Sequence, residues 1–311
     1  MSKEKRANIT PRTTDTREIE VKSIAKKTER VVVRRFIFLL TVVFLAFAGC
    51  INVAGFAAPD NFNREIKVFG VTIWATQSVT DTRLLHAGNV LAQYLDNDGD
   101  GEPDRTSVSS ELAARNATIL MFGSQSEAEA FDLQTLPSEI TAVQFLLDSE
   151  TNSNFDPDGI NSHFDGSLEK VLNLITTHGY ANAWPETFGE YQGSELSVAM
   201  DSARGGYFPD IPAEYPSIAW YTNKDNTRNY EAQISRYLYW ALTSNLGAQD
   251  YTDRFGEIKD EWQLNTADLV TAEDPQVTEI LSNPDYSIPN ILPDGNYQGF
   301  EVEITDLECG T

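Results

Sequence analysis

A run of 23 uncharged residues, 36–58, divides this 311-residue chain into two parts of opposite charge. Residues 1–35 carry eleven Lys and Arg against five acidic side chains, whereas the rest of the chain carries twelve basic and 42 acidic ones. About 20 apolar residues suffice for a helix to cross a bilayer core. Because basic flanks stay in the cytoplasm, the pattern predicts a cytoplasmic tail or long n-region over 1–35 and a signal or transmembrane segment over 36–58. An exported acidic domain is then expected over 59–311.

The end of the apolar run, Phe47-Ala48-Gly49-Cys50, resembles the lipobox of bacterial lipoproteins. The resemblance implies that the chain is cut before Cys50 and that this cysteine is acylated. Phe47 stands where leucine is usual, and the n-region is long for a signal peptide. An uncleaved anchor and a cleaved signal therefore stay open beside the lipoprotein. Each of these interpretations places the domain outside the cytoplasm, in the periplasm or at the cell surface, with the membrane as its first partner.

Composition limits the other partners of the exported domain. The net charge of −24 argues against nucleic acid, because binding to phosphates needs a basic surface. A protein or glycan partner stays open. The hydrophobic share of 41% is enough for a sizeable core. The two cysteines exclude a disulfide scaffold and any metal site built from several cysteines.

Strand and helix patterns alternate in the first half of the domain and helices dominate the second. Strands are predicted over 65–75, 117–122 and 141–147. A helix begins near Ser78 and leads to Leu95, and further helices are predicted over 166–177, 193–204 and 229–246. From Asp274 onward Pro, Asn, Asp and Gly predict an extended tail. The pattern predicts one α+β domain, with a strand/helix N-terminal half packed against a mainly helical C-terminal half.

The sharpest local pattern follows the first predicted helix and runs Asp96-Asn-Asp98-Gly-Asp100-Gly101-Glu102-Pro-Asp104. Ca²⁺ takes six to eight oxygen ligands, and carboxylates at alternate positions wrap around it where a glycine permits the sharp turn. The pattern resembles the DxDxDG calcium loop of EF-hand, dockerin and thrombospondin-repeat sequences. This implies side-chain ligands at Asp96, Asp98 and Asp100, a main-chain ligand at Glu102, and Asp104 at the position that often acts through water.

The twelfth position of this loop is Ser107 instead of the bidentate Glu of an EF-hand. The absence of this glutamate favours a structural Ca²⁺ site over a sensor. Such a site would be completed by Glu111 or by a distant residue. A plain acidic turn is the alternative. A weaker second candidate is the segment with Asn154, Asp156 and Asp158, followed by Asp165 at its twelfth position; there an ordinary polar loop is the favoured interpretation.

Residues 166–177 raise an enzymatic alternative. A sheet-bearing half, an active-site helix and a helical half resemble the zincin metallopeptidases. Glu169 and Asn173 stand where that family has its two zinc-binding histidines, and Lys170 replaces the general-base Glu. The resemblance therefore implies a degenerate copy of a metal-dependent hydrolase, with Glu169, His178 and Glu186 as the candidate catalytic residues.

The aromatic residues between 180 and 240 raise a third alternative, a carbohydrate-active or carbohydrate-binding protein. Their helical spacing over 230–240 instead favours a place in the core. The sequence as a whole favours a membrane- or lipid-anchored, extracytoplasmic calcium-binding protein without an intact catalytic motif. Whether it is an enzyme stays open.

Overall fold

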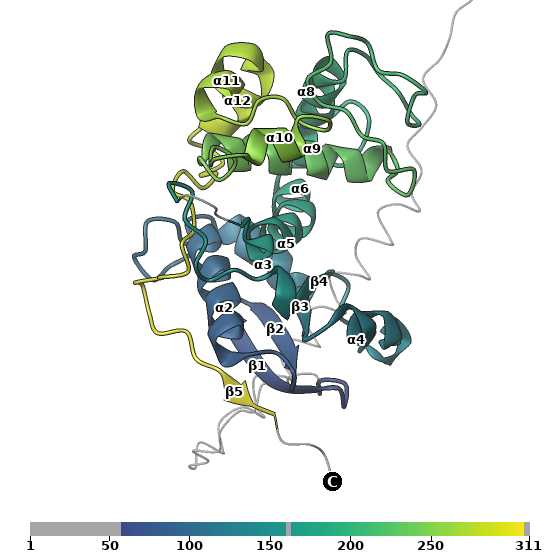
Figure 1. Ribbon diagram of the computed structural model, residues 1–311. Helices are drawn as coiled ribbons and strands as arrows, with labels where there is room; N and C mark the ends of the chain where they lie inside the picture. Colours follow the sequence, from purple (N-terminus) through teal and green to yellow (C-terminus); the bar gives the residue numbers. More distant parts are fainter. Residues whose placement is uncertain (1–56, 160–162, 308–311) are drawn as a thin grey trace, which may run out of the picture. The chain divides into compact units, whose positions relative to one another are not determined.

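A five-stranded sheet with most of its helices stacked on one face organises residues 57–159 and 163–307, which are the residues that the computed structural model describes (Figure 1). They belong to one unit, Phe56–Thr311. The strands follow the order β4-β3-β2-β1-β5, in which β2, β3 and β4 are parallel and β1 is antiparallel to both of its neighbours. Their bounds are β1 Phe62–Val68, β2 Val71–Thr76, β3 Thr118–Phe122, β4 Val143–Leu147 and β5 Thr305–Asp306. The predicted α+β domain is confirmed.

The predicted anchor lies almost entirely outside the described residues, as do the basic tail 1–35 and Cys50. Within 57–159 and 163–307, none of the helices has the length and apolarity that a membrane crossing requires.

The first predicted strand is in fact a hairpin. β1 and β2 are joined at Phe69 and Gly70, whose φ angles of 47° and 84° both fall in the left-handed region. A two-residue turn of this kind matches the twist of the paired strands. Residues 65–75 are rich in β-branched and aromatic side chains on both sides of Gly70, so they resemble one strand, although the internal glycine marks the turn.

The helices bear out the change of character between the two halves. Those of the first half are α2 Asp81–Leu95, α3 Thr106–Ala114 and α4 Gln125–Ala130. Those of the second half are α5 Gly166–Ile175, α6 Ala181–Ala183, α7 Pro185–Phe188, α8 Glu195–Ala203, α9 Tyr230–Asn245, α10 Arg254–Ile258, α11 Ala267–Glu273 and α12 Pro275–Ser282. A π-helical turn, Thr176–Tyr180, joins α5 to α6, and short 3-10 turns lie at Leu133–Thr135 and Asp148–Glu150.

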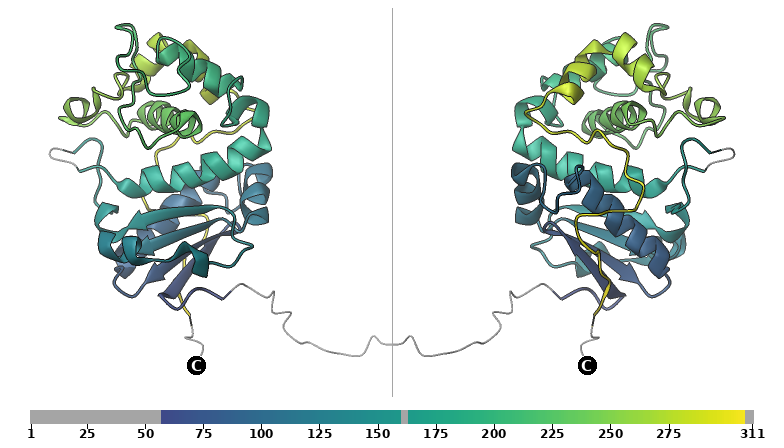
Figure 2. Two further views of the ribbon diagram at one scale, coloured as in Figure 1. Left: turned by 90° about the vertical axis from the view of Figure 1, so that its right-hand side faces the viewer. Right: turned by 90° about the vertical axis from the view of Figure 1, so that its left-hand side faces the viewer.

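The two faces of the sheet support cores of very different size. Ile119 and Met121 of β3 point into the main core, where α2 and α5 pack on the sheet and α9 packs on α5 (Figure 2). The alternate residues Leu120 and Phe122 point into a small second cluster covered by Ala128 of α4. This alternation follows from the two-residue period of a strand.

The tail predicted from Asp274 begins later than expected. Asp274 caps α12 through its side chain, and Pro275 occupies the first helical turn, a combination that starts helices. The extended part is residues 283–307, here called the C-terminal strap. It runs from α12 past the end of α2 back to the sheet, where β5 pairs with β1 (Figures 1 and 2).

Candidate metal centre

The predicted calcium loop connects α2 to α3 and is closed by its own backbone. The amide of Asp104 donates to the carbonyl of Leu95 at 2.9 Å, so the two ends of the loop meet. Gly99 and Gly101 have φ angles of 73° and 94°, which L side chains rarely adopt. These glycines let the chain reverse within a few residues and bring acidic side chains from both ends of the loop together.

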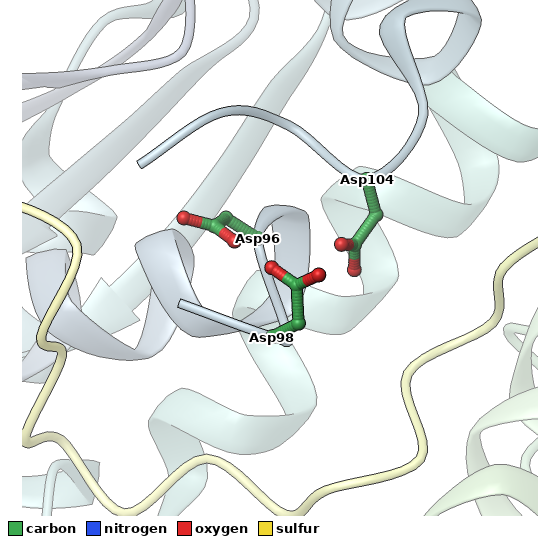
Figure 3. Close-up of side chains that lie close together, drawn as sticks. All are labelled: Asp96, Asp98 and Asp104. Carbon is green, nitrogen blue, oxygen red and sulfur yellow. The ribbon is translucent and has the colours of Figure 1, made fainter. Parts of the chain in front are cut away.

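Three of the predicted ligands converge. Asp96, Asp98 and Asp104 each place one carboxylate oxygen within 4.8 Å of the other two (Figure 3). Asp96 is buried, Asp104 half-buried and Asp98 exposed. Asp100 is outside this triad, and its Oδ1 accepts a hydrogen bond from the Glu102 amide at 2.9 Å. In the part of the chain that the structure describes, no other three His, Cys, Asp or Glu side chains converge in this way.

Asp96 is the most tightly held member of the triad. Its Oδ1 accepts from the amides of Gly99 and Asp100, and its Oδ2 accepts from the Gly101 amide and the Tyr297 hydroxyl. Burial alone would raise the pKa of Asp96, but these four hydrogen bonds together lower it below its usual value. Asp96 is thus held as a carboxylate in a fixed orientation.

Asp104, in contrast to Asp96, has a pKa raised above its usual value. Burial raises the pKa of Asp104, and the neighbouring charges of Asp98, Asp96 and Asp100 raise it further, against one hydrogen bond from the Asn97 amide. Three carboxylates this close repel one another, and a divalent cation among them would relieve that repulsion.

The C-terminal strap contributes contacts that the sequence did not reveal. Tyr297 reaches Asp96 across 201 positions of sequence, and Asn97 bonds the backbone of Asn290 and Ile291. Glu111, the nearer candidate for completing the site, instead pairs with Arg115. No local pattern connects residue 297 with residue 96, so only the folded chain shows this neighbour.

Solvent reaches the triad from one side. Asp98 and Asp104 line a cavity of about 610 Å³, whose other walls come from the last residue of α9, from α11 and α12, and from the C-terminal strap. Most of the polar side chains around it are Asn, Ser and Thr, among them Asn245 and Ser282. An ion at the triad therefore has an entry path and room for water ligands.

The weaker second loop is arranged differently. Asp165 is 1% exposed, and its Oδ1 accepts from the amides of Asn152 and Ser167. Its Oδ2 accepts from the Ser167 hydroxyl at 2.6 Å and lies 2.7 Å from His86 Nε2. Asp156 accepts from the Asp158 amide, as in an ordinary Asx turn. Asp165 thus caps α5, with both oxygens in use.

The residues of the zincin-like alternative lie apart from the triad. Glu169 pairs with Arg236 of α9 at 2.9 Å, and Arg236 also binds Glu261. His178 lies in the π-helical turn, where burial lowers its pKa, and Glu186 lies on α7. Glu169 therefore has a guanidinium as its partner, and within the described residues it belongs to no group of three ligating side chains.

The aromatic residues of the helical half lie mostly inside it. Those that are buried include Tyr180, Tyr221, Tyr230, Tyr237, Tyr239, Trp240 and Trp262, whereas Trp184, Tyr215 and Trp220 are partly exposed and Tyr191 and Tyr207 are exposed. The buried rings form core contacts, such as the pair Tyr221 and Tyr237 with centroids 5.6 Å apart. This burial agrees with the core interpretation of the helical spacing over 230–240.

The triad offers carboxylate oxygens alone, which suit hard cations such as Ca²⁺ and Mg²⁺ better than zinc or copper. It can bind and orient an ion. Comparisons with protein families, with curated proteins and with solved structures found no match to this chain.

Proposed function

We propose that residues 59–311 form a calcium-binding domain held outside the cytoplasm, anchored by residues 36–58 or by a lipidated Cys50. The observation that carries the proposal is the convergence of Asp96, Asp98 and Asp104 on a loop with the DxDxDG spacing. The role proposed for the ion is structural, because the loop joins α2 to α3 and also supports the C-terminal strap.

Calcium fits this loop better than magnesium does. Ca²⁺ accepts six to eight oxygens in flexible geometry, whereas Mg²⁺ demands a near-octahedral shell and gives up its waters reluctantly. The three carboxylates, the Glu102 carbonyl and waters from the adjoining cavity would supply such a shell. Waters would take the place of the missing twelfth-position Glu.

The proposal is tested by melting the domain with calcium and with chelator. Ligand that binds only the folded state stabilises it by RT ln(1 + [L]/Kd), about 2.7 kcal/mol at a hundredfold excess over Kd. We expect a higher melting temperature in calcium and a smaller rise in magnesium. The double variant Asp98→Asn/Asp104→Asn should lose most of the calcium response, because it removes two of the three charges.

Asp250→Asn is the matched control, since Asp250 is exposed and lies outside the triad. It should respond to calcium as the wild type does. Identical melting of the wild type in calcium and in chelator, with no metal retained after purification, would show that the loop is only an acidic turn.

A further inference from the structure

We propose that calcium binding and docking of the C-terminal strap are coupled, with Tyr297 as the residue that couples them. The ion would fix the loop on which the strap lies, and the strap would in turn orient Asp96 for the ion. This inference rests on the proposed calcium site and adds to it a means by which calcium controls the order of the C-terminal segment.

The first step is the contact between Tyr297 and the most buried ligand. The Tyr297 hydroxyl donates to Asp96 Oδ2, and the Tyr297 side chain is itself buried. Its ring packs edge-on against Phe300, with the ring centroids 4.9 Å apart. Phe300 in turn packs edge-on against Phe69, with the centroids 5.3 Å apart. Packing thus holds the tyrosine in position, and its hydroxyl fixes the orientation of the carboxylate.

The second step is the close passage of the strap over the loop. A Cβ on Gly299 would lie 2.9 Å from the Cα of Gly101 and would collide with the Tyr297 hydroxyl. Asn97, the second residue of the loop, accepts at Oδ1 from the amides of Asn290 and Ile291, both at 2.9 Å. Its Nδ2 also donates to the Ile291 carbonyl at 2.8 Å. The strap therefore packs directly on the loop and is hydrogen-bonded to it.

The third step is how little regular structure holds the strap elsewhere. Within the described residues of the strap, β5 is the only strand and pairs with β1 at just two positions, Arg64 and Glu65. Gln93, at the end of α2, bonds Asp294 and the Gly295 amide. A loop that opens because its carboxylates repel one another would therefore release much of the support for residues 290–300.

Coupling of this kind is reciprocal, so the strap must alter calcium affinity by the same factor by which calcium alters docking of the strap. Groups that orient metal ligands typically change metal affinity 10- to 100-fold when they are removed. Tyr297→Phe removes the hydroxyl and keeps the ring that packs on Phe300. We expect this variant to bind calcium about tenfold more weakly in a calorimetric titration of the full chain.

Tyr230→Phe is the matched control. The Tyr230 hydroxyl also donates to a carboxylate, Asp201 Oδ2 at 3.0 Å, but Asp201 does not belong to the triad. This variant should keep wild-type calcium affinity. A melting curve in chelator checks that both variants are folded before the titration.

Hydrogen exchange of the wild type gives a second measurement that needs no variant. The amides of residues 290–300 should exchange at least about tenfold more slowly with calcium than with chelator, by the same linkage. In Asp98→Asn, which has lost one ligand, calcium should slow the exchange of these amides little or not at all relative to chelator.

The outcomes separate the two proposals. Calcium binding with unchanged affinity in Tyr297→Phe and calcium-independent exchange of the strap would overturn the coupling and leave the calcium-binding function intact. A wild type that binds no calcium would overturn both.

Discussion

Glu169 forms an ion pair with Arg236 that the sequence alone did not predict. Its carboxylate lies 2.9 Å from Arg236, and the guanidinium stacks 4.4 Å from the Trp240 ring and also binds Glu261. The Glu169 side chain is 19% exposed and that of Arg236 12%, so little solvent screens the pair. Burial raises the pKa of Glu169, but the charges of Arg236 and Lys170 and the hydrogen bond from Arg236 together outweigh it and lower the pKa below its usual 4.5.

Glu169→Gln should therefore lower the free energy of unfolding by about 3 kcal/mol at pH 7, because it leaves a largely buried guanidinium short of a charge. A lowered pKa in the folded state means that the ionised carboxylate stabilises the fold. This contribution is complete above the pKa of the unfolded chain and is lost as the pH falls through the lower folded value. Urea denaturation between pH 7 and pH 3 should show a steeper acid loss below about pH 4.5 in the wild type than in the variant.

Glu273→Gln is the control for this prediction, since Glu273 is exposed on the outer side of α11. It should change neither the stability at pH 7 nor its dependence on pH. Parallel acid profiles for the wild type and Glu169→Gln would contradict the role given to the Glu169–Arg236 pair.

Among the helices and strands, the sequence pattern predicted the elements whose ends are set by local periodicity and capping residues. It missed those that depend on packing between residues far apart in the sequence. The Asn229 and Ser194 side chains cap α9 and α8, and both helices were predicted from the sequence. The π-helical turn after α5 was not, because it depends on α3: a Cβ on Gly179 would lie 2.7 Å from Val108. The candidate metal site divides in the same way. Its acidic loop could be read locally, whereas Tyr297 lies 201 positions from Asp96.

The start of α5 offers a prediction that also tests the second candidate calcium loop. Asp165 caps this helix through the Ser167 amide and contacts His86, while Asp158 is exposed earlier in the same loop. Asp165→Ala should lower the free energy of unfolding by about 2 kcal/mol, the upper range for losing a helix cap. Asp158→Ala should leave stability nearly unchanged. Neither variant should alter the calcium affinity in a titration, and a loss of bound calcium in both would instead assign an ion to this loop.

At the scale of the whole chain, charge is distributed unevenly along the sequence. Residues 1–35 carry a net charge of +6 and residues 36–311 a net charge of −30, with the uncharged segment 36–58 at the border. A surface with such an excess of acids attracts divalent cations and keeps copies of the domain apart. Both properties suit a domain that faces an exterior in which calcium is available, and the same charge pattern predicts the orientation of the chain at the membrane.

The test of that orientation uses the full chain expressed in a bacterium that processes lipoproteins. We expect the protein in the membrane fraction, with residues 59–311 digested by protease added outside the cytoplasmic membrane. The basic flank should be retained inside, because Lys and Arg near an apolar segment resist translocation.

The variant Cys50→Ser distinguishes between a lipid anchor and a helical anchor. If the lipobox interpretation holds, the variant loses the metabolic lipid label and its precursor is not cut. If neither the wild type nor the variant carries the label and both stay in the membrane, the anchor is an uncleaved helix. A wild type found free in the cytoplasm would contradict the predicted export and, with it, the exposure of the acidic loop to extracytoplasmic calcium.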